Sequence, residues 1–103
     1  MPKLVVLKSA RQDYRDILRY IVERSGSLET GKRFLEDLKA KTRHLASLPP
    51  ALGRKRPELG DNIRTFTFKS YILIFRYRGD RFELINVLHG HRDIEAFFDE
   101  SGD

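Results

Sequence analysis

Apolar residues recur at intervals of three and four in two stretches of the first half of the chain. The two apolar stripes are Tyr14, Ile17, Leu18, Ile21 and Val22, followed by Phe34, Leu35, Leu38, Leu45 and Leu48. This spacing places each set on one face of an α-helix. Only a few residues separate the stripes, so we expect two helices that pack roughly antiparallel as a hairpin.

The residues that flank the stripes are typical of helix ends. Ser9 and Gln12 have the spacing of a capping box, in which both side chains satisfy free backbone groups at a helix start. Gly26 fits the end of the first helix, and Ser27 can cap the second. The proline pair at 49–50 should end the second helix, because proline lacks the amide donor and clashes with the preceding turn.

Outside the helical stretches the sequence is rich in β-branched and aromatic residues. The predicted strands are Lys3–Leu7 before the helices and Ile63–Phe68, Tyr71–Arg78 and Arg81–Leu88 after them. The short spacers at 69–70 and 79–80 are typical of hairpins, so the last three strands should be successive and antiparallel.

Together these elements predict an α+β fold with the order strand, helix, helix, strand, strand, strand. The helical hairpin should pack on one face of a mainly antiparallel sheet. Tyr71–Phe75 is apolar at consecutive positions, so the other face of the sheet also needs a cover. Either another molecule or a short final helix at Asp93–Phe98 could supply it. We expect a single domain over residues 1–98 and a loose acidic tail over residues 99–103.

Charge is divided unevenly along the chain. Residues 1–92 hold all 20 Lys and Arg but only ten of the 15 acids, a formal charge of +10. Residues 93–103 hold the other five acids and no base, a formal charge of −5. A body this basic favours encounter with acidic proteins or with nucleic acid.

Several classes of protein are disfavoured by what the sequence lacks. There is no cysteine, which removes disulfides and thiolate chemistry and is typical of the reducing cytoplasm. No apolar stretch approaches the length of a signal peptide core or a membrane span. His89 and His91 have no obvious third ligand nearby, so we expect no metal and no cofactor.

Two short segments carry most of the candidate chemistry. Gly53–Leu59 reads Gly-Arg-Lys-Arg-Pro-Glu-Leu, a cationic loop in which Pro57 restricts the backbone and Glu58 can hold Arg54 or Arg56 in a fixed position. The other segment, Val87–Ile94, places two histidines where a strand ends. His89 is then either a structural residue of the strand end or a group that changes charge near neutral pH.

These segments, in their order and spacing, resemble a known family. Together with Ile63–Phe66 and Tyr71–Tyr77, they are similar to the RelE/ParE toxins of type II toxin-antitoxin systems, and the likeness covers Leu4–Phe98. The Arg-Asp pair after the final strand favours the ParE branch.

The resemblance implies a toxin that inhibits DNA gyrase by binding and is neutralised by a ParD-like antitoxin. RelE relatives instead cut messenger RNA on the ribosome, and one fold serves both activities. Under that alternative, His89 would be the acid or base and Arg64 a cation at the phosphate of a metal-free endoribonuclease. A third alternative is a relic that retains only antitoxin binding.

The residues expected to contact the target or the antitoxin are Arg54, Arg56, Arg64, Tyr71, Arg76, His89 and Arg92. Because the body is basic and the sheet has two apolar faces, the contacting segment of the antitoxin should be acidic and carry apolar anchors. Direct contact with nucleic acid stays open from the sequence.

Overall fold

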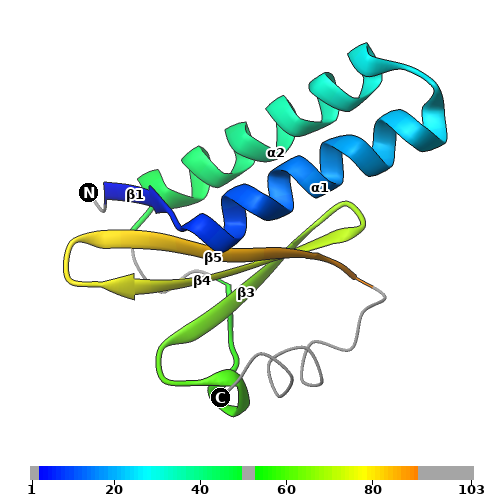
Figure 1. The fold of residues 1–103 in the computed structure, drawn as a ribbon. Coiled ribbons are helices and arrows are strands. Elements are labelled where there is room, and N and C mark those ends of the chain that lie inside the picture. The colour runs from blue at the N-terminus through cyan, green and yellow to red at the C-terminus, as the bar shows by residue number, and fades with distance from the viewer. Residues whose placement is uncertain (1–2, 50–52, 91–103) are drawn as a thin grey trace.

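A helical hairpin packs on one face of a five-stranded sheet in the computed structural model, which describes residues 3–49 and 53–90 (Figure 1). In chain order the elements are β1 (Lys3–Val6), α1 (Lys8–Ser25), α2 (Leu28–Ser47), β2 (Arg54–Lys55), the 3-10 helix η1 (Pro57–Leu59), β3 (Ile63–Phe68), β4 (Tyr71–Arg78) and β5 (Arg81–His89). The predicted α+β fold and element order are confirmed. The two-residue strand β2 and η1 were not predicted.

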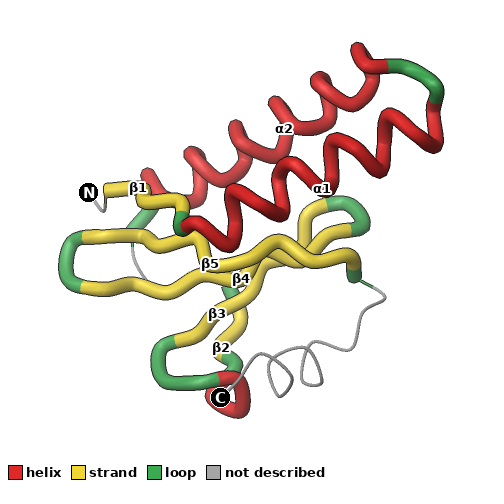
Figure 2. The backbone as a smooth tube through the Cα atoms, in the orientation of Figure 1, coloured by secondary structure: helices red, strands yellow, loops and turns green. Residues whose placement is uncertain are grey.

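The sheet is mixed, with the strand order β1-β5-β4-β3-β2. The three hairpin-like pairings are antiparallel, whereas β1 pairs parallel with β5. The first and last strands are therefore neighbours, and the helical hairpin lies between them in sequence (Figure 2). This crossover brings the start of the chain to the end of the β4–β5 hairpin, where the amide of Lys3 donates to the carbonyl of Asp80 at 2.6 Å.

The predicted junction between the helices is confirmed. Gly26 has a left-handed backbone with φ 71°, and its amide donates to the carbonyl of Val22 at 2.8 Å. The Ser27 hydroxyl accepts from the amide of Thr30 at 3.1 Å and so caps α2. Helix α2 ends at Ser47, two residues before Pro49.

The predicted capping box at the start of α1 is wrong. The helix begins at Lys8, and its cap residue Leu7 makes no side-chain hydrogen bond. Ser9 lies inside the first turn, and its hydroxyl donates to the carbonyl of Ile85 on β5. Gln12 donates to the carboxylate of Asp16 at 3.0 Å. Because both side chains bond elsewhere, they are not available to the backbone of the helix start.

The main core lies between the hairpin and the sheet (Figure 1). Its most completely buried large side chains are Leu38 and Leu45 from α2 and Leu73, Phe75, Phe82 and Leu84 from β4 and β5. The stripes read from the sequence supply this core, as their spacing predicts.

A smaller cluster lies on the opposite face of the sheet. Ile63, Ile74 and Leu88 are buried there, with Leu59 and Ile85 packed against them. These three side chains are 6%, 0% and 5% exposed, so this face of the sheet has a small core of its own. The final helix expected at Asp93–Phe98 lies outside the described residues.

Asp13 fixes α1 to an irregularity in β5. Ile74 pairs with Asn86 but the next residue, Phe75, pairs with Leu84, so Ile85 is an extra residue in the ladder. The Asp13 carboxylate accepts from the Asn86 side-chain amide at 2.9 Å and from the Val87 backbone amide at 2.8 Å. One helix carboxylate thus satisfies the backbone where the strand pairing is interrupted.

Asp13→Ala should lower the free energy of unfolding by about 2 kcal/mol, because it leaves the amide of buried Val87 without this acceptor. Urea unfolding followed by circular dichroism measures the change. Asp16→Ala is the matched control, since Asp16 is exposed on the same helix. Equal losses in the two variants would contradict the role given to Asp13.

Candidate functional site

Four cations gather at one end of the sheet, and we call Lys3, Arg76, Arg78 and Arg81 the sheet-end cations. The tight turn at 79–80 places Arg78 directly opposite Arg81, and the parallel pairing of β1 places Lys3 beside Arg81. Like charges in direct cross-strand pairs destabilise a sheet. Glu83 offsets part of this repulsion through Arg76 and Arg81, and an anionic partner would offset more of it.

Glu83 is the carboxylate around which the cluster is arranged. Its side chain is 4% exposed, and it accepts from Nε of Arg76 at 2.7 Å and lies 3.9 Å from Nη1 of Arg81. The hydrogen bond from Arg76, followed by the charges of Arg76, Arg78 and Arg81, lowers the pKa of Glu83 below its ordinary value. Arg76 and Arg81 pair with this one carboxylate and Arg78 lies opposite Arg81, so these cations outnumber the carboxylate between them.

The lowered pKa of Glu83 predicts a dependence of stability on pH. Since the folded pKa is below the unfolded one, the ionised pair stabilises the fold above the ordinary pKa of glutamate. This contribution is lost as pH falls through the folded pKa. In Glu83→Gln, the decline of the unfolding free energy between about pH 5 and about pH 3 should be shallower than in the wild type. Urea unfolding over this range tests it, and identical slopes would contradict it.

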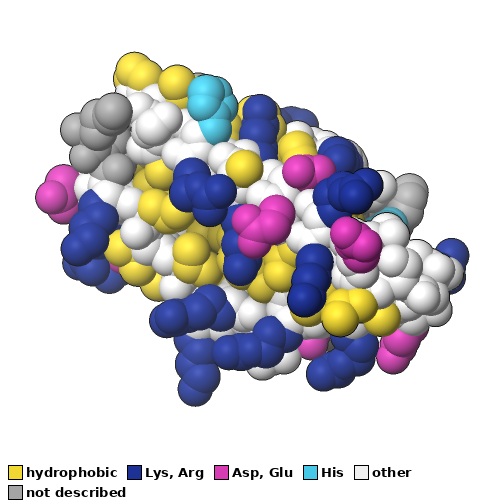
Figure 3. Space-filling view, turned by 90° about the horizontal axis from the view of Figure 1, so that it is seen from above, with side chains coloured by type: hydrophobic (Ala, Val, Ile, Leu, Met, Phe, Trp, Pro, Cys, Tyr) yellow, Lys and Arg dark blue, Asp and Glu magenta, His cyan; other side chains and the backbone are white. Residues whose placement is uncertain are grey.

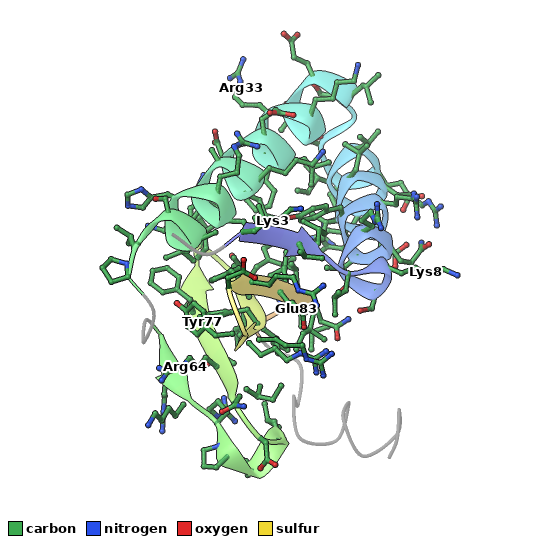
Figure 4. The ribbon with its side chains drawn as sticks, turned by 90° about the vertical axis from the view of Figure 1, so that its left-hand side faces the viewer. Lys3, Lys8, Arg33, Arg64, Tyr77 and Glu83 are labelled. Carbon is green, nitrogen blue, oxygen red and sulfur yellow. The ribbon has the colours of Figure 1, made fainter. Side chains whose placement is uncertain are left out.

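Arg64 and Arg76 lie on opposite faces of the sheet. Arg76 pairs in register with Ile63, so the next residue of β3, Arg64, points the other way. The guanidinium of Arg64 lies 5.9 Å from the centre of the Tyr77 ring, an arrangement visible in Figure 4. The two arginines predicted as one group therefore serve different surfaces.

The cationic loop is ordered by its own residues. The Arg56 side chain bonds to Glu58, and its backbone amide donates to the carbonyl of Ile63 at 2.9 Å. This bond from Arg56 is the main cause of a lowered pKa at Glu58. Of the two arginines expected to be held by Glu58, Arg56 is the one that pairs with it, while Arg54 is exposed in β2 beside Thr65.

Tyr71 and His89 belong to an aromatic group at the other end of β4. Tyr71 is 7% exposed, and its ring centre lies 5.4 Å from Phe34 and 5.4 Å from His89. The imidazole meets the tyrosine ring edge-on and is half-buried. Tyr71 is thus a core residue that could influence a partner only by positioning its neighbours.

His89 and Arg64 do not come together. His89 lies opposite Tyr71 and Arg64 opposite Phe75, four residues further along β4 and on strands at either side of it. Strand geometry separates their Cα atoms by roughly 16 Å. A base and a cation that act on one phosphate must both reach it, and this separation is long for such a pair.

The helix side of the molecule presents a different surface. Figure 3, seen onto the helices, shows Lys and Arg side chains spread over that face with Asp and Glu among them. Opposite charges at short range reduce the field that a distant partner meets. The sheet end differs in that its cations stand in register on neighbouring strands, with Arg78 opposite Arg81 and Lys3 beside Arg81.

A hollow of about 630 Å³ lies beside the sheet-end cations. The turn between η1 and β3 forms one wall and the end of β4 the other. The lining side chains that matter below are Leu59, Asp61, Ile63, Arg76, Arg78 and Ile85.

Sequence reasoning missed Lys3, Arg78 and Arg81. The predicted turn at 79–80 already placed Arg78 opposite Arg81, so a register count could have found that pair. Lys3 joins them only through the pairing of β1 with β5, which no local pattern specifies. Arg92, also expected in the site, lies outside the described residues.

Two kinds of feature are absent from residues 3–49 and 53–90. No group of three His, Asp or Glu side chains there is placed to hold a metal ion. No helix in these ranges has both the length and the apolar character needed to cross a membrane.

The helical hairpin, the mixed sheet and the cluster of cations define a small α+β protein with a cationic surface at one end of its sheet. The family model described as "ParE toxin of type II toxin-antitoxin system, parDE" matches residues 4–94, so the chain belongs to the ParE toxin family. The resemblance found in the sequence is confirmed.

A solved structure described as the chromosomal ParDE toxin-antitoxin system from P. aeruginosa has the same fold. It matches with a TM-score of 0.77 and 20% identity, over 86% of this chain and 96% of that one. At this identity the likeness supports the fold alone. Among curated proteins no match was found.

Proposed function

We propose that this ParE-family toxin inhibits DNA gyrase by binding to it and stabilising the broken-DNA state, without making or breaking a bond itself. The observation that carries the proposal is the gathering of Lys3, Arg78 and Arg81 in one row beside Glu83. Such a row is suited to docking on an acidic or DNA-bearing surface and accelerates the encounter with it.

A ParD-like antitoxin is the proposed neutralising partner. The basic body calls for carboxylates, and the exposed apolar side chains call for apolar anchors, so the contacting segment should carry both. Both partners would meet the toxin in the cytoplasm, where gyrase acts on DNA.

The endoribonuclease alternative has less support from the geometry. Its two named groups, His89 and Arg64, stand on strands that flank β4 and at different levels along it. His89 is packed against Tyr71, which is the environment expected of a structural strand-end residue.

Two assays with purified toxin separate the activities. Added to gyrase and plasmid, it should block supercoiling and accumulate linear DNA. Added to translating ribosomes, it should leave the message intact. Cut message together with unaffected supercoiling would overturn the proposal. No effect in either assay would also overturn it and would indicate a relic that retains only antitoxin binding.

His89→Gln should change inhibition of gyrase by less than about threefold, because glutamine can keep a polar contact at the strand end. A nuclease that used this imidazole as acid or base would lose roughly a hundredfold or more. The supercoiling and message-cleavage assays measure both outcomes, with thermal unfolding as a check that the variant folds. A large loss of gyrase inhibition in a folded variant would contradict the structural role of His89.

A further inference from the structure

The hollow between the η1–β3 turn and the end of β4 has an apolar floor and a cationic rim. Leu59, Ile63 and Ile85 line it and belong to the smaller hydrophobic cluster of the sheet. Arg76 and Arg78 line the side toward the sheet end. Arg76 is fixed by its 2.7 Å bond to Glu83, while Arg78 is exposed.

We infer that this hollow binds an acidic peptide segment, with one aliphatic side chain on the apolar floor and a neighbouring carboxylate on Arg78. Charge complementarity supports the acidic character, since the four sheet-end cations outnumber the two carboxylates beside them, Glu83 and the turn residue Asp80. A volume of about 630 Å³ accommodates a side chain of this size together with its backbone.

The lining favours a peptide over nucleic acid. Single-stranded nucleic acid binds on aromatic platforms beside cations. Tyr77 is the one aromatic residue among the described residues that line the hollow, and its ring is already engaged: Phe75 and Phe82 meet it edge-on at 5.9 and 5.6 Å, and Arg64 lies over it. Asp61 is exposed on the opposite wall and would repel a continuous row of phosphates. A peptide could still bind if its carboxylate lay on the side away from Asp61.

This inference rests on the proposed function in one respect, because the occupant we assign is the contacting segment of the antitoxin. Arg78 belongs both to the rim of the hollow and to the row opposite Arg81. A peptide seated in the hollow would therefore occupy a cation of the proposed gyrase-binding surface. Neutralisation would follow from direct competition for Arg78.

The test uses the purified full chain and a fluorescein-labelled peptide in which a leucine is flanked by glutamates. Fluorescence anisotropy should show saturable binding. Replacing the leucine by glycine, or the glutamates by glutamine, should weaken binding about tenfold in each case. Arg78→Gln should also weaken it about tenfold.

Arg81→Gln is the matched control within the cluster, because it removes the same charge but Arg81 is not among the described residues that line the hollow. It should weaken binding less than about threefold. Equal losses in both arginine variants, no effect of leucine removal, or equally strong competition by a short DNA duplex would each overturn the inference, since the surface would then select only for charge.

The two proposals fail separately. Specific peptide binding by a chain that leaves gyrase unaffected would remove the proposed target and keep the hollow. Gyrase inhibition by a chain that does not bind the peptide would remove the role of the hollow and keep the proposed target. The supercoiling assay contains no peptide, so each result is read independently.

Discussion

Phe75→Ala should lower the free energy of unfolding by about 4 kcal/mol, a large part of the stability of a domain of this size. Phe75 is 0% exposed, its ring stacks on Phe82 at 4.5 Å, and it meets Tyr77 edge-on at 5.9 Å. Removing it leaves a cavity in the main core, beside the face of β4 and β5 that the helices cover, and the paired backbones of the two strands cannot move to close it. Urea unfolding followed by circular dichroism measures the loss.

The same substitution should loosen the cationic loop. Gly53 has φ +77°, and a Cβ built there would lie 2.9 Å from Cζ of Phe75, so the loop packs directly on this ring. Tyr20→Ala removes an aromatic ring that is 46% exposed and serves as the control, with an expected loss below about 1 kcal/mol. A Phe75 variant no less stable than the Tyr20 variant would contradict the role given to the ring.

Helices were predictable because their determinants are local. The apolar stripes depend on residues three and four apart, and the caps at Gly26 and Ser27 bond to residues three or four positions away. The capping box at Ser9 failed for the opposite reason. Its hydroxyl bonds to Ile85, 76 positions further along the chain, and such a partner leaves no trace in the local pattern.

The strand pairings also divide into those set by local turns, which were predictable, and those set by distant residues, which were not. Turns of two residues specified the antiparallel pairs of β3, β4 and β5. The parallel pairing of β1 with β5 and the contact of Asp13 with Val87 join distant parts of the chain and were not predicted. The fold class could be read from the sequence, while the contacts that fix the hairpin to the sheet could not.

For the candidate site, residue type was predictable and grouping was not. Arg64 and Arg76 were both chosen, yet the register of β3 and β4 places them on opposite faces. A shift of one residue would exchange these faces, so the grouping depends on the register of the whole ladder. The same register brings together Arg78 and Arg81, which the sequence presented only as residues beside a turn.

The positions of Arg78 and Arg81 indicate a role in binding a partner more than a role in stabilising the fold. They are exposed and directly opposite, so each raises the cost of placing the other there. Glu83 offsets part of this cost through Arg81, 3.9 Å away, and a partner that binds the pair would offset more of it. Neutral replacements should therefore weaken binding much more than they change the stability of the fold.

The double variant Arg78→Gln/Arg81→Gln should weaken inhibition of gyrase supercoiling by roughly a hundredfold, as two exposed charge contacts are lost together. Glutamine keeps the two methylene groups nearest the strand and removes both the repulsion and the 3.9 Å pairing of Arg81 with Glu83, so the melting temperature should change little. The measurement is the toxin concentration that halves supercoiling, compared with a thermal melt of the same preparation.

Arg19→Gln/Arg33→Gln removes the same two charges from exposed positions on α1 and α2 and controls for net charge. Long-range steering depends on total charge, whereas docking depends on where the charges lie. Inhibition of supercoiling by this control should therefore fall by less than about fivefold. Equal losses in both double variants would show that the toxin responds only to its overall charge. A lower melting temperature in the sheet-end variant would instead show that Arg78 and Arg81 stabilise the hairpin, and either result would remove the sheet end as the docking surface.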